Sequence, residues 1–213
     1  MKVIYPKVEF ITPVTEESGK LVMKRIEEIG RVCYKSEDKI TEDSYKKFIS
    51  NLIKRGHESV LEHGSITVKF ICDRGVSHEI VRHRLASYSQ ESTRYCNYSG
   101  DQFGNEITVI KPCFWEEDTE AYRLWLDSCK SAEMHYFLML KSGASPQEAR
   151  SVLPNSLKTE VVMTANIREW RHFFRLRCSR AAHPQMREVA LMALVKFYHA
   201  MPELFQDIWE ESI

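Results

Sequence analysis

The chain has 213 residues, and its 30 lysine and arginine residues are balanced by 30 aspartate and glutamate residues. A chain with no net positive charge lacks a general attraction to nucleic acid or to an acidic membrane surface. No apolar run approaches the length of a membrane-spanning helix. The length suits one domain, or two closely packed lobes, and we expect a single domain over residues 1–213.

Six cysteines are scattered along the chain without the paired spacing of metal ligands. The first residues do not show the charged and then apolar pattern of a secretory signal. We therefore expect reduced thiols in a cytoplasmic protein.

The first third of the chain predicts one strand and two helices. Alternating apolar residues over positions 3–12 indicate a strand that Pro13 ends. Helical spacing runs through residues 16–34. A second helix opens at Thr41 and closes at Gly56, because glycine favours the left-handed conformation that ends helices.

Titratable side chains follow that second helix directly, in the segment His57-Glu58-Ser59-Val60-Leu61-Glu62-His63. Four ionisable groups at a helix end indicate one wall of a site, although such groups also cap or bridge neighbouring elements. A zinc site built from His57, Glu58 and His63 is a third interpretation, but the spacing matches no common zinc pattern. We predict no bound metal.

An arginine-rich loop follows a predicted strand over residues 66–72 and a predicted helix over residues 76–84, which Ser77 would cap. The loop reads Arg82-His83-Arg84-Leu85-Ala86-Ser87-Tyr88-Ser89-Gln90-Glu91-Ser92-Thr93-Arg94-Tyr95. Guanidinium groups bind phosphates and carboxylates through two parallel hydrogen bonds, and the hydroxyl and amide groups between them add donors and acceptors. On the predicted helix, Arg82 and Arg84 would point in different directions, each toward an anionic group. The loop is therefore expected to bind a phosphorylated ligand.

The middle of the chain predicts an extended segment at residues 93–98 and a strand at residues 107–109, with turn-forming residues at 99–101 and 104–105 between them. A long helix is expected over residues 117–142.

The remaining sequence predicts the first residues of two helices. Ser145-Pro146-Gln147-Glu148 is a capping box that opens a short helix carrying Arg150. After a strand over residues 159–164, Asn166 caps a helix that runs to Arg177. Arg177 continues the apolar stripe of this helix and is therefore expected to point toward the interior.

Another face of that helix carries the basic residues Arg168, Arg171, His172 and Arg175. We expect most of this basic face to be solvated or paired with acids. Two further helices are expected over residues 184–198 and 202–209. Together the elements predict an α+β fold, with a mixed or antiparallel sheet flanked by helices. The glycine pattern of a dinucleotide-binding fold is missing.

The run Arg82-His83-Arg84, followed after seven residues by Ser92 and then by Arg94 and Tyr95, resembles the signature of flavin-dependent thymidylate synthases. Further segments resemble the other ligand-binding blocks of this family, in the right order: His57-Glu58-Ser59 with Glu62-His63, Ala149-Arg150-Ser151-Val152-Leu153-Pro154, and residues 166–177. Four ordered blocks over about residues 45–190 are far more specific than one motif.

The resemblance implies an FAD-dependent reductive methylation of dUMP to dTMP. Methylenetetrahydrofolate would supply the one-carbon unit and NADPH the reducing equivalents. A cysteine nucleophile is not expected. The unrelated cysteine-dependent synthases place their thiolate in a Pro-Cys-His motif, whereas Pro112-Cys113 is followed here by Phe114. The family also implies a homotetramer whose sites lie between subunits.

The resemblance also implies roles for individual residues, matched by position. The expected FAD contacts are His57, Ser59, Arg82, His83, Arg84, Gln90, Asn166, Ile167, Arg168 and His172. The expected dUMP contacts are Glu79, Arg82, Gln90, Glu91, Ser92, Thr93, Arg94, Arg150 and Arg177. Arg177 is the expected catalytic residue, because a fixed cation beside the uracil ring stabilises charge that develops there.

Two other functions stay open on the sequence alone. The basic loop with Tyr88, Tyr95 and Tyr98 would also suit a nucleotide- or RNA-binding module, although the balanced charge argues against it. A different flavoenzyme of nucleotide metabolism is the second alternative.

Overall fold

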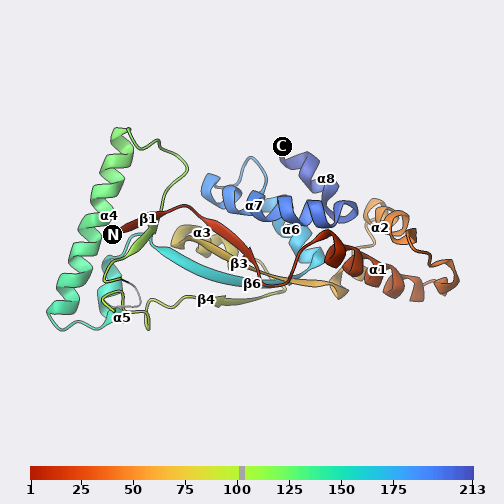
Figure 1. The fold of residues 1–213 in the computed structure, drawn as a ribbon, viewed down its shortest axis with the longest axis horizontal. Helices are drawn as coiled ribbons and strands as arrows, with labels where there is room; N and C mark the ends of the chain where they lie inside the picture. The colour runs from red at the N-terminus through yellow and green to blue at the C-terminus, as the bar shows by residue number, and fades with distance from the viewer. Residues whose placement is uncertain (101–103) are drawn as a thin grey trace. The chain divides into compact units, whose positions relative to one another are not determined.

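The computed structural model describes residues 1–100 and 104–213, and Figure 1 shows its helices and strands. The chain divides into two compact units. Unit 1 comprises Met1–Lys7, Phe70–Arg82 and Ser89–Val162, and unit 2 comprises Val8–Lys69, His83–Tyr88 and Met163–Ile213. The arginine-rich loop therefore contributes residues to both units.

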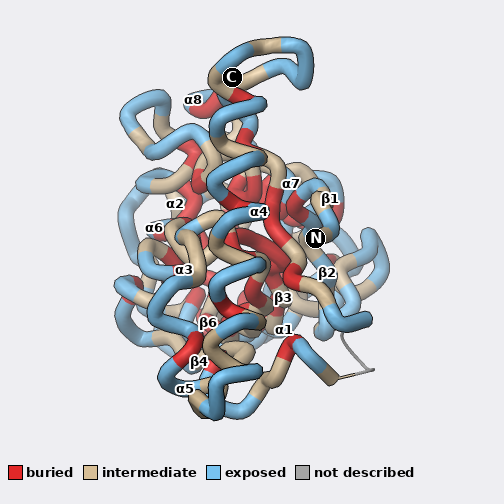
Figure 2. The backbone as a smooth tube through the Cα atoms, turned by 90° about the vertical axis from the view of Figure 1, so that its left-hand side faces the viewer, coloured by how far each residue is buried: buried red, intermediate tan, exposed pale blue. Residues whose placement is uncertain are grey.

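A four-stranded antiparallel sheet with helices gives the chain an α+β fold, as the sequence predicts. The strands lie in the order β2-β3-β6-β4 and span Lys7–Phe10, Ser65–Asp73, Lys158–Asn166 and Ala86–Gln90 respectively. Along β6, buried and half-buried residues alternate without exception, because successive strand residues point to opposite faces. Figure 2 draws the buried positions of the chain in red.

A short parallel pair of strands in unit 1 joins β1 (Lys2–Ile4) to β5 (Thr108–Ile110). The prediction of one strand over residues 3–12 is wrong, because β1 ends before Pro6 and β2 begins after it. Proline has no amide hydrogen with which to continue a strand ladder.

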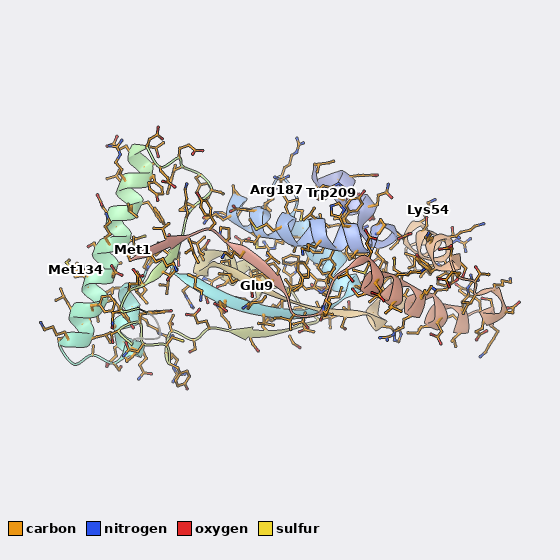
Figure 3. All side chains as sticks on the ribbon, viewed as in Figure 1. Met1, Glu9, Lys54, Met134, Arg187 and Trp209 are labelled. Atoms are coloured by element: carbon orange, nitrogen blue, oxygen red, sulfur yellow. The ribbon has the colours of Figure 1, made fainter. Side chains whose placement is uncertain are left out.

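The helices of unit 1 are α3 (Arg74–Ile80), α4 (Glu120–Lys141) and α5 (Pro146–Ala149), followed by the 3₁₀ turn η4 (Arg150–Val152). The predicted capping box is confirmed, because the Glu148 carboxylate accepts hydrogen bonds from the backbone and the hydroxyl of Ser145. Tyr136 of α4 packs with Tyr98 and Val109 in the core of this unit. Met134 projects from the opposite, exposed side of α4 (Figure 3).

Unit 2 is largely helical. Its helices are α1 (Glu16–Val32), α2 (Ser44–Arg55), α6 (Ile167–Arg177), α7 (Pro184–Ala200) and α8 (Pro202–Ser212), with 3₁₀ helices η1 (Glu37–Lys39) and η2 (Glu58–His63). Trp170 and Phe174 of α6 stack with ring centres 5.6 Å apart, and Phe197 of α7 packs on both rings. Trp209, labelled in Figure 3, stacks on Tyr198 and so joins α8 to α7. This aromatic core fixes the position of α6.

The helix before the arginine-rich loop is shorter and starts earlier than the sequence predicts. Asp73 caps α3 by accepting the amide hydrogen of Val76 at 2.8 Å, and the helix ends at Ile80. The predicted cap, Ser77, instead donates its hydroxyl to the Arg74 carbonyl inside the first turn. Because Arg82 and Arg84 lie beyond the helix, the prediction that helical geometry sets their directions is wrong.

Two segments after α3 also differ from the predictions. The sequence did not predict β4, which begins at Ala86 within the loop. Residues 93–95 form a turn and not an extended segment, with the Ser92 carbonyl accepting the amide of Cys96 at 2.9 Å. Gly104 and Asn105 form the predicted turn with positive φ angles, whereas residues 101–103 lie outside the described residues. Among the described residues, no helix has both the length and the apolar character needed to cross a membrane.

Candidate active site

The first turn of α6 organises a polar cluster in unit 2. Asn166 caps the helix as predicted, because its Oδ1 accepts the amide hydrogen of Glu169 at 2.9 Å. The amide of Ile167 donates to the carbonyl of Gly64 at 2.8 Å, so the helix start is also tied to the segment before β3. The backbone at the start of α6 is therefore held by two independent hydrogen bonds.

His83 lies at the centre of this cluster and is 4% exposed. Its ring packs edge-on against Phe173, with the ring centres 4.9 Å apart. Its Nε2 lies 3.0 Å from Nε of Arg177, and its Nδ1 lies 3.2 Å from Oε1 of Glu169. The arginine Nε–H can only donate, so Nε2 accepts, and the ring hydrogen is on Nδ1, from which it is donated to Glu169.

The electrostatic surroundings of His83 favour this neutral ring. Burial, with the nearby charges of Arg177 and His172 adding to it, lowers its pKa to about 4. Burial also raises the pKa of Glu169, an effect that His172 opposes. The pair is therefore a neutral imidazole that donates a hydrogen bond to Glu169, and not an ion pair.

A cavity of about 420 Å³ opens beside this cluster in unit 2. Its lining residues are Glu58, Glu62, Leu85, Asn166, Arg168, Glu169, His172 and Arg175. Three of them, Asn166, Arg168 and His172, are among the predicted FAD contacts. Leu85 has a positive φ of 63° and its side chain is 78% exposed, so a non-glycine residue is held in a strained conformation at the cavity.

Acidic side chains pair with the arginines of α6. Arg168 lies 2.7 Å from Glu62, and Arg175 lies 2.9 Å from Asp207. Arg171 is 1% exposed and makes a bidentate ion pair with Asp207, with Nη2 2.7 Å from Oδ2 and Nη1 3.0 Å from Oδ1. The prediction that this face is paired with acids is confirmed, but the complete burial of Arg171 was not anticipated.

The other predicted FAD contacts in unit 2 differ widely in exposure. His57 and Ser59 lie exposed at the start of η2, and Arg84 is exposed next to His83. The side chain of Ile167 is fully buried. Arg177, the predicted catalytic residue, is half-buried at the end of α6, with its guanidinium tied to His83.

Predicted ligand contacts in unit 1 form a second polar group. The Gln90 amide donates to the hydroxyls of Ser77 and Thr159, at 3.0 and 3.3 Å. The Glu91 carboxylate accepts from Lys158 at 2.9 Å and from the Tyr98 hydroxyl at 3.1 Å. Burial, with the charge of Glu91 adding to it, raises the pKa of Tyr98, so this phenol stays protonated.

The loop after β4 carries three further predicted dUMP contacts, Ser92, Thr93 and Arg94, and Arg150 of η4 contacts this loop. Arg150 donates to the buried hydroxyl of Thr93 at 3.3 Å. Ser92 accepts the amide hydrogen of Arg94 at 3.3 Å, and the Arg94 guanidinium lies 5.5 Å from the ring centre of Tyr95. All nine predicted dUMP contacts except Thr93 are exposed or half-buried.

One group of possible metal ligands occurs among the described residues, and it consists of His83, Glu169 and His172. It differs from the set that the sequence suggested, which was His57, Glu58 and His63. Both ring nitrogens of His83 already take part in hydrogen bonds. The geometry therefore suits a hydrogen-bonded chain better than a metal site.

Sequence reasoning missed Glu169, although a signal was present. Glu169, Phe173 and Arg177 follow one another at intervals of four residues, so they share one face of α6. The prediction used the apolar stripe through Trp170 and left this neighbouring stripe aside.

A solved structure shares the fold of this chain. It superposes with a TM-score of 0.78 on the crystal structure of a UMP/dUMP methylase, PolB, from Streptomyces cacaoi bound with 5-Br dUMP. The superposition covers 99% of this chain and 97% of that one, at 24% sequence identity. The two proteins therefore share a fold.

Sequence comparison is more specific. Residues 20–203 match the family model of the thymidylate synthase complementing protein, Thy1. The flavin-dependent thymidylate synthase of Geobacter sulfurreducens is 34% identical, over 84% of this chain and 78% of the relative. That of Mycolicibacterium vanbaalenii is 31% identical over 94% and 86%, and that of Pyrococcus abyssi is 37% identical over 73% and 63%. The chain belongs to the flavin-dependent thymidylate synthases, which are methyltransferases of dTMP biosynthesis.

Proposed function

We propose that the chain catalyses the FAD-dependent reductive methylation of dUMP to dTMP, with methylenetetrahydrofolate as one-carbon donor and NADPH as reductant. The observation that carries this proposal is the cavity in unit 2, where Asn166, Arg168 and His172 lie together. All three are residues that the resemblance matches to flavin contacts of the family.

The chemistry of the cavity fits a flavin dinucleotide. Arg168 and Arg175 supply cationic groups for a pyrophosphate, and His172 and Asn166 supply hydrogen-bonding groups for ring or ribose atoms. The flavin, when bound, supplies hydride transfer. The chain's own residues bind and orient it, and the acids Glu58 and Glu62 hold the arginines in place.

In unit 1, Arg94 and Arg150 suit the phosphate of dUMP, with the hydroxyls of Ser92 and Thr93 as further partners. Ser92 is assigned to binding and not to nucleophilic attack, because a serine nucleophile needs an adjacent base. Arg177 is assigned to the uracil ring, where its fixed charge would stabilise negative charge that develops during methylation.

Three cysteines have raised pKa values, which argues against a nucleophilic role for them. Burial raises the pKa of Cys178, which follows α6, to about 12 and that of Cys129 to about 11. Burial also raises the pKa of Cys96, next to the arginine-rich loop. A thiol with a raised pKa carries little thiolate at neutral pH and is a poor nucleophile.

The proposal includes a homotetramer with active sites at subunit interfaces, in which residues 1–213 of each subunit act as one catalytic domain. Light scattering coupled to size-exclusion chromatography would measure the assembly. A monomer that retains full activity would contradict this part of the proposal.

The test of function begins with the absorption spectrum of the purified full-length protein, which should show a bound flavin that responds to dUMP. Tritium release from 5-tritiated dUMP should then require both methylenetetrahydrofolate and NADPH. UMP serves as the comparison substrate, because the structurally similar PolB is a UMP/dUMP methylase.

A colourless protein that releases no tritium would contradict the proposal. A flavin spectrum without tritium release would instead favour a different flavoenzyme of nucleotide metabolism. Binding of RNA with a steep salt dependence, in the absence of flavin, would favour the binding module.

A further inference from the structure

We propose that Glu169 is a positioning residue, which acts through His83 to orient the guanidinium of Arg177. The inference rests on the proposed role of Arg177 and deepens it. All three residues belong to unit 2, and their contacts run from the Glu169 carboxylate to Nδ1 of His83 and from Nε2 of His83 to Nε of Arg177.

The chain of contacts works only with one tautomer of His83. Nε2 accepts a hydrogen from Arg177 only when the ring hydrogen is on Nδ1. In the other tautomer, an N–H of His83 would face an N–H of Arg177, and the two donors would repel each other. The group that fixes the hydrogen on Nδ1 of His83 therefore also determines whether the hydrogen bond from Arg177 to Nε2 can form.

Glu169 is suited to fix the hydrogen on Nδ1. An ionised carboxylate can only accept a hydrogen bond, so its position 3.2 Å from Nδ1 favours the hydrogen on that nitrogen. Glu169 and His83 are both buried, at 8% and 4% exposure, so water competes little for these atoms. A chain of two hydrogen bonds is also more directional than either bond alone.

Both ends of the contact are held by the surrounding structure. The backbone amide of Glu169 is bound to the Asn166 cap, and Phe173, one helical turn further on, packs against the His83 ring. The hydroxyl of Tyr88 donates to the His83 carbonyl at 3.0 Å and fixes the backbone of that residue. The His83 ring therefore has little freedom to rotate. Its hydrogen bond to Glu169 fixes the direction of Nε2, which accepts the hydrogen bond from Arg177.

The first test requires neither flavin nor substrate. Long-range ¹H–¹⁵N spectra of the full-length protein with ¹⁵N-labelled histidine should show His83 as a neutral ring with its hydrogen on Nδ1. Glu169→Leu should remove this preference. A wild-type His83 with its hydrogen on Nε2, or a Glu169→Leu variant with an unchanged spectrum, would overturn the proposal.

The second test is a double-mutant cycle on dUMP affinity and turnover. Glu169→Leu should weaken dUMP binding about tenfold and lower kcat by a similar factor, whereas Glu169→Gln, which keeps an acceptor oxygen, should cost two- to fivefold. In an Arg177→Ala background, Glu169→Leu should have almost no further effect. Fully additive losses would show that Glu169 acts independently of Arg177 and would overturn the proposal that Glu169 acts through His83.

Glu27→Leu is the matched control, because Glu27 is another buried helix acid with an arginine partner, Arg31, at 2.7 Å. It should lower stability without changing the His83 spectrum or the dUMP affinity. If Glu169→Leu does not fold, the Glu169→Gln variant and the wild-type spectrum still decide the question. A wild-type protein that lacks methylation activity would contradict the proposed function. The tautomer measurement would still test whether Glu169 orients Arg177 through His83.

Discussion

Arginines in the two units are held in different ways. On α6 of unit 2, Arg171 and Arg168 have acidic partners at 2.7 Å, and Arg177 is bound to a buried histidine. In unit 1, Arg94 of the loop after β4 is exposed, and Arg150 of η4 contacts a neutral hydroxyl. The difference indicates that α6 arginines are positioned before any ligand arrives, whereas these two arginines of unit 1 keep their charge available for one.

The largest effect should come from Arg171→Ala. Arg171 is 1% exposed, so its removal leaves a cavity in the core and takes away the bidentate partner of Asp207, a half-buried carboxylate, at a cost of about 3 kcal/mol. Burial tends to raise the pKa of Asp207, but hydrogen bonds from Arg171 outweigh it and keep that pKa below its usual value. Urea unfolding would measure the loss. Arg175→Ala is the control, because its 42% exposed side chain shares the same acid and should contribute about 1 kcal/mol or less.

Next, Arg177→Ala should lower kcat about 100-fold, because a positioned charge at the reacting ring is lost. The free energy of unfolding should fall by only about 1 kcal/mol, the value of one hydrogen bond to His83. Steady-state tritium release and urea unfolding measure the two quantities. Arg180→Ala, which removes an exposed arginine bound to a C-terminal carbonyl, should change neither by much. Full activity in a folded, flavin-loaded Arg177→Ala protein would refute the catalytic assignment.

The buried histidine of unit 2 predicts a pH dependence. The pKa of His83 is lowered to about 4, so between pH 6.5 and pH 4 the unfolded chain takes up a proton that the folded protein does not. His83 should therefore not reduce the free energy of unfolding above pH 6.5, and it should lower that free energy by about 3 kcal/mol as the pH drops through this window. Unfolding of wild type and His83→Gln at several pH values isolates the contribution. Identical slopes for the two proteins would contradict it.

For unit 1, Arg94→Ala should raise the dissociation constant for dUMP about tenfold, because a charge-assisted hydrogen bond to phosphate is lost. Stability should hardly change, since the Arg94 side chain is exposed. Calorimetric titration measures the affinity, and Arg123→Ala on α4 serves as a control for the loss of an exposed arginine. An equal loss in both variants would indicate only a general effect of charge.

The smallest effect concerns Leu85. A leucine at φ 63° carries a strain of about 1 kcal/mol that glycine relieves, so Leu85→Gly should raise the free energy of unfolding by less than about 1 kcal/mol. Leu85→Ala shortens the same side chain but keeps the strain, so it should give no gain. Thermal unfolding distinguishes them. A destabilised Leu85→Gly protein would show that the exposed leucine packs usefully in solution.

Much of this fold could be predicted because its signals are local. The Asn166 cap, the Ser145 capping box and the alternation in β6 each depend on residues within a few positions of one another. The prediction failed around α3, where it took Ser77 as the cap, whereas the structure uses Asp73, the last residue of β3. It also missed β4, because its polar residues lack the apolar alternation of a typical strand.

Sequence alone determined the family, the helix starts and most of the candidate ligand contacts, because these depend on ordered motifs and on residues that are close together in the chain. The tertiary structure decided which of those side chains are held and by what. Glu169 meets His83 across 86 positions of sequence, and His83 meets Arg177 across 94. Only folding brings such groups together, and only burial gives their hydrogen bonds the strength to fix a tautomer and an orientation.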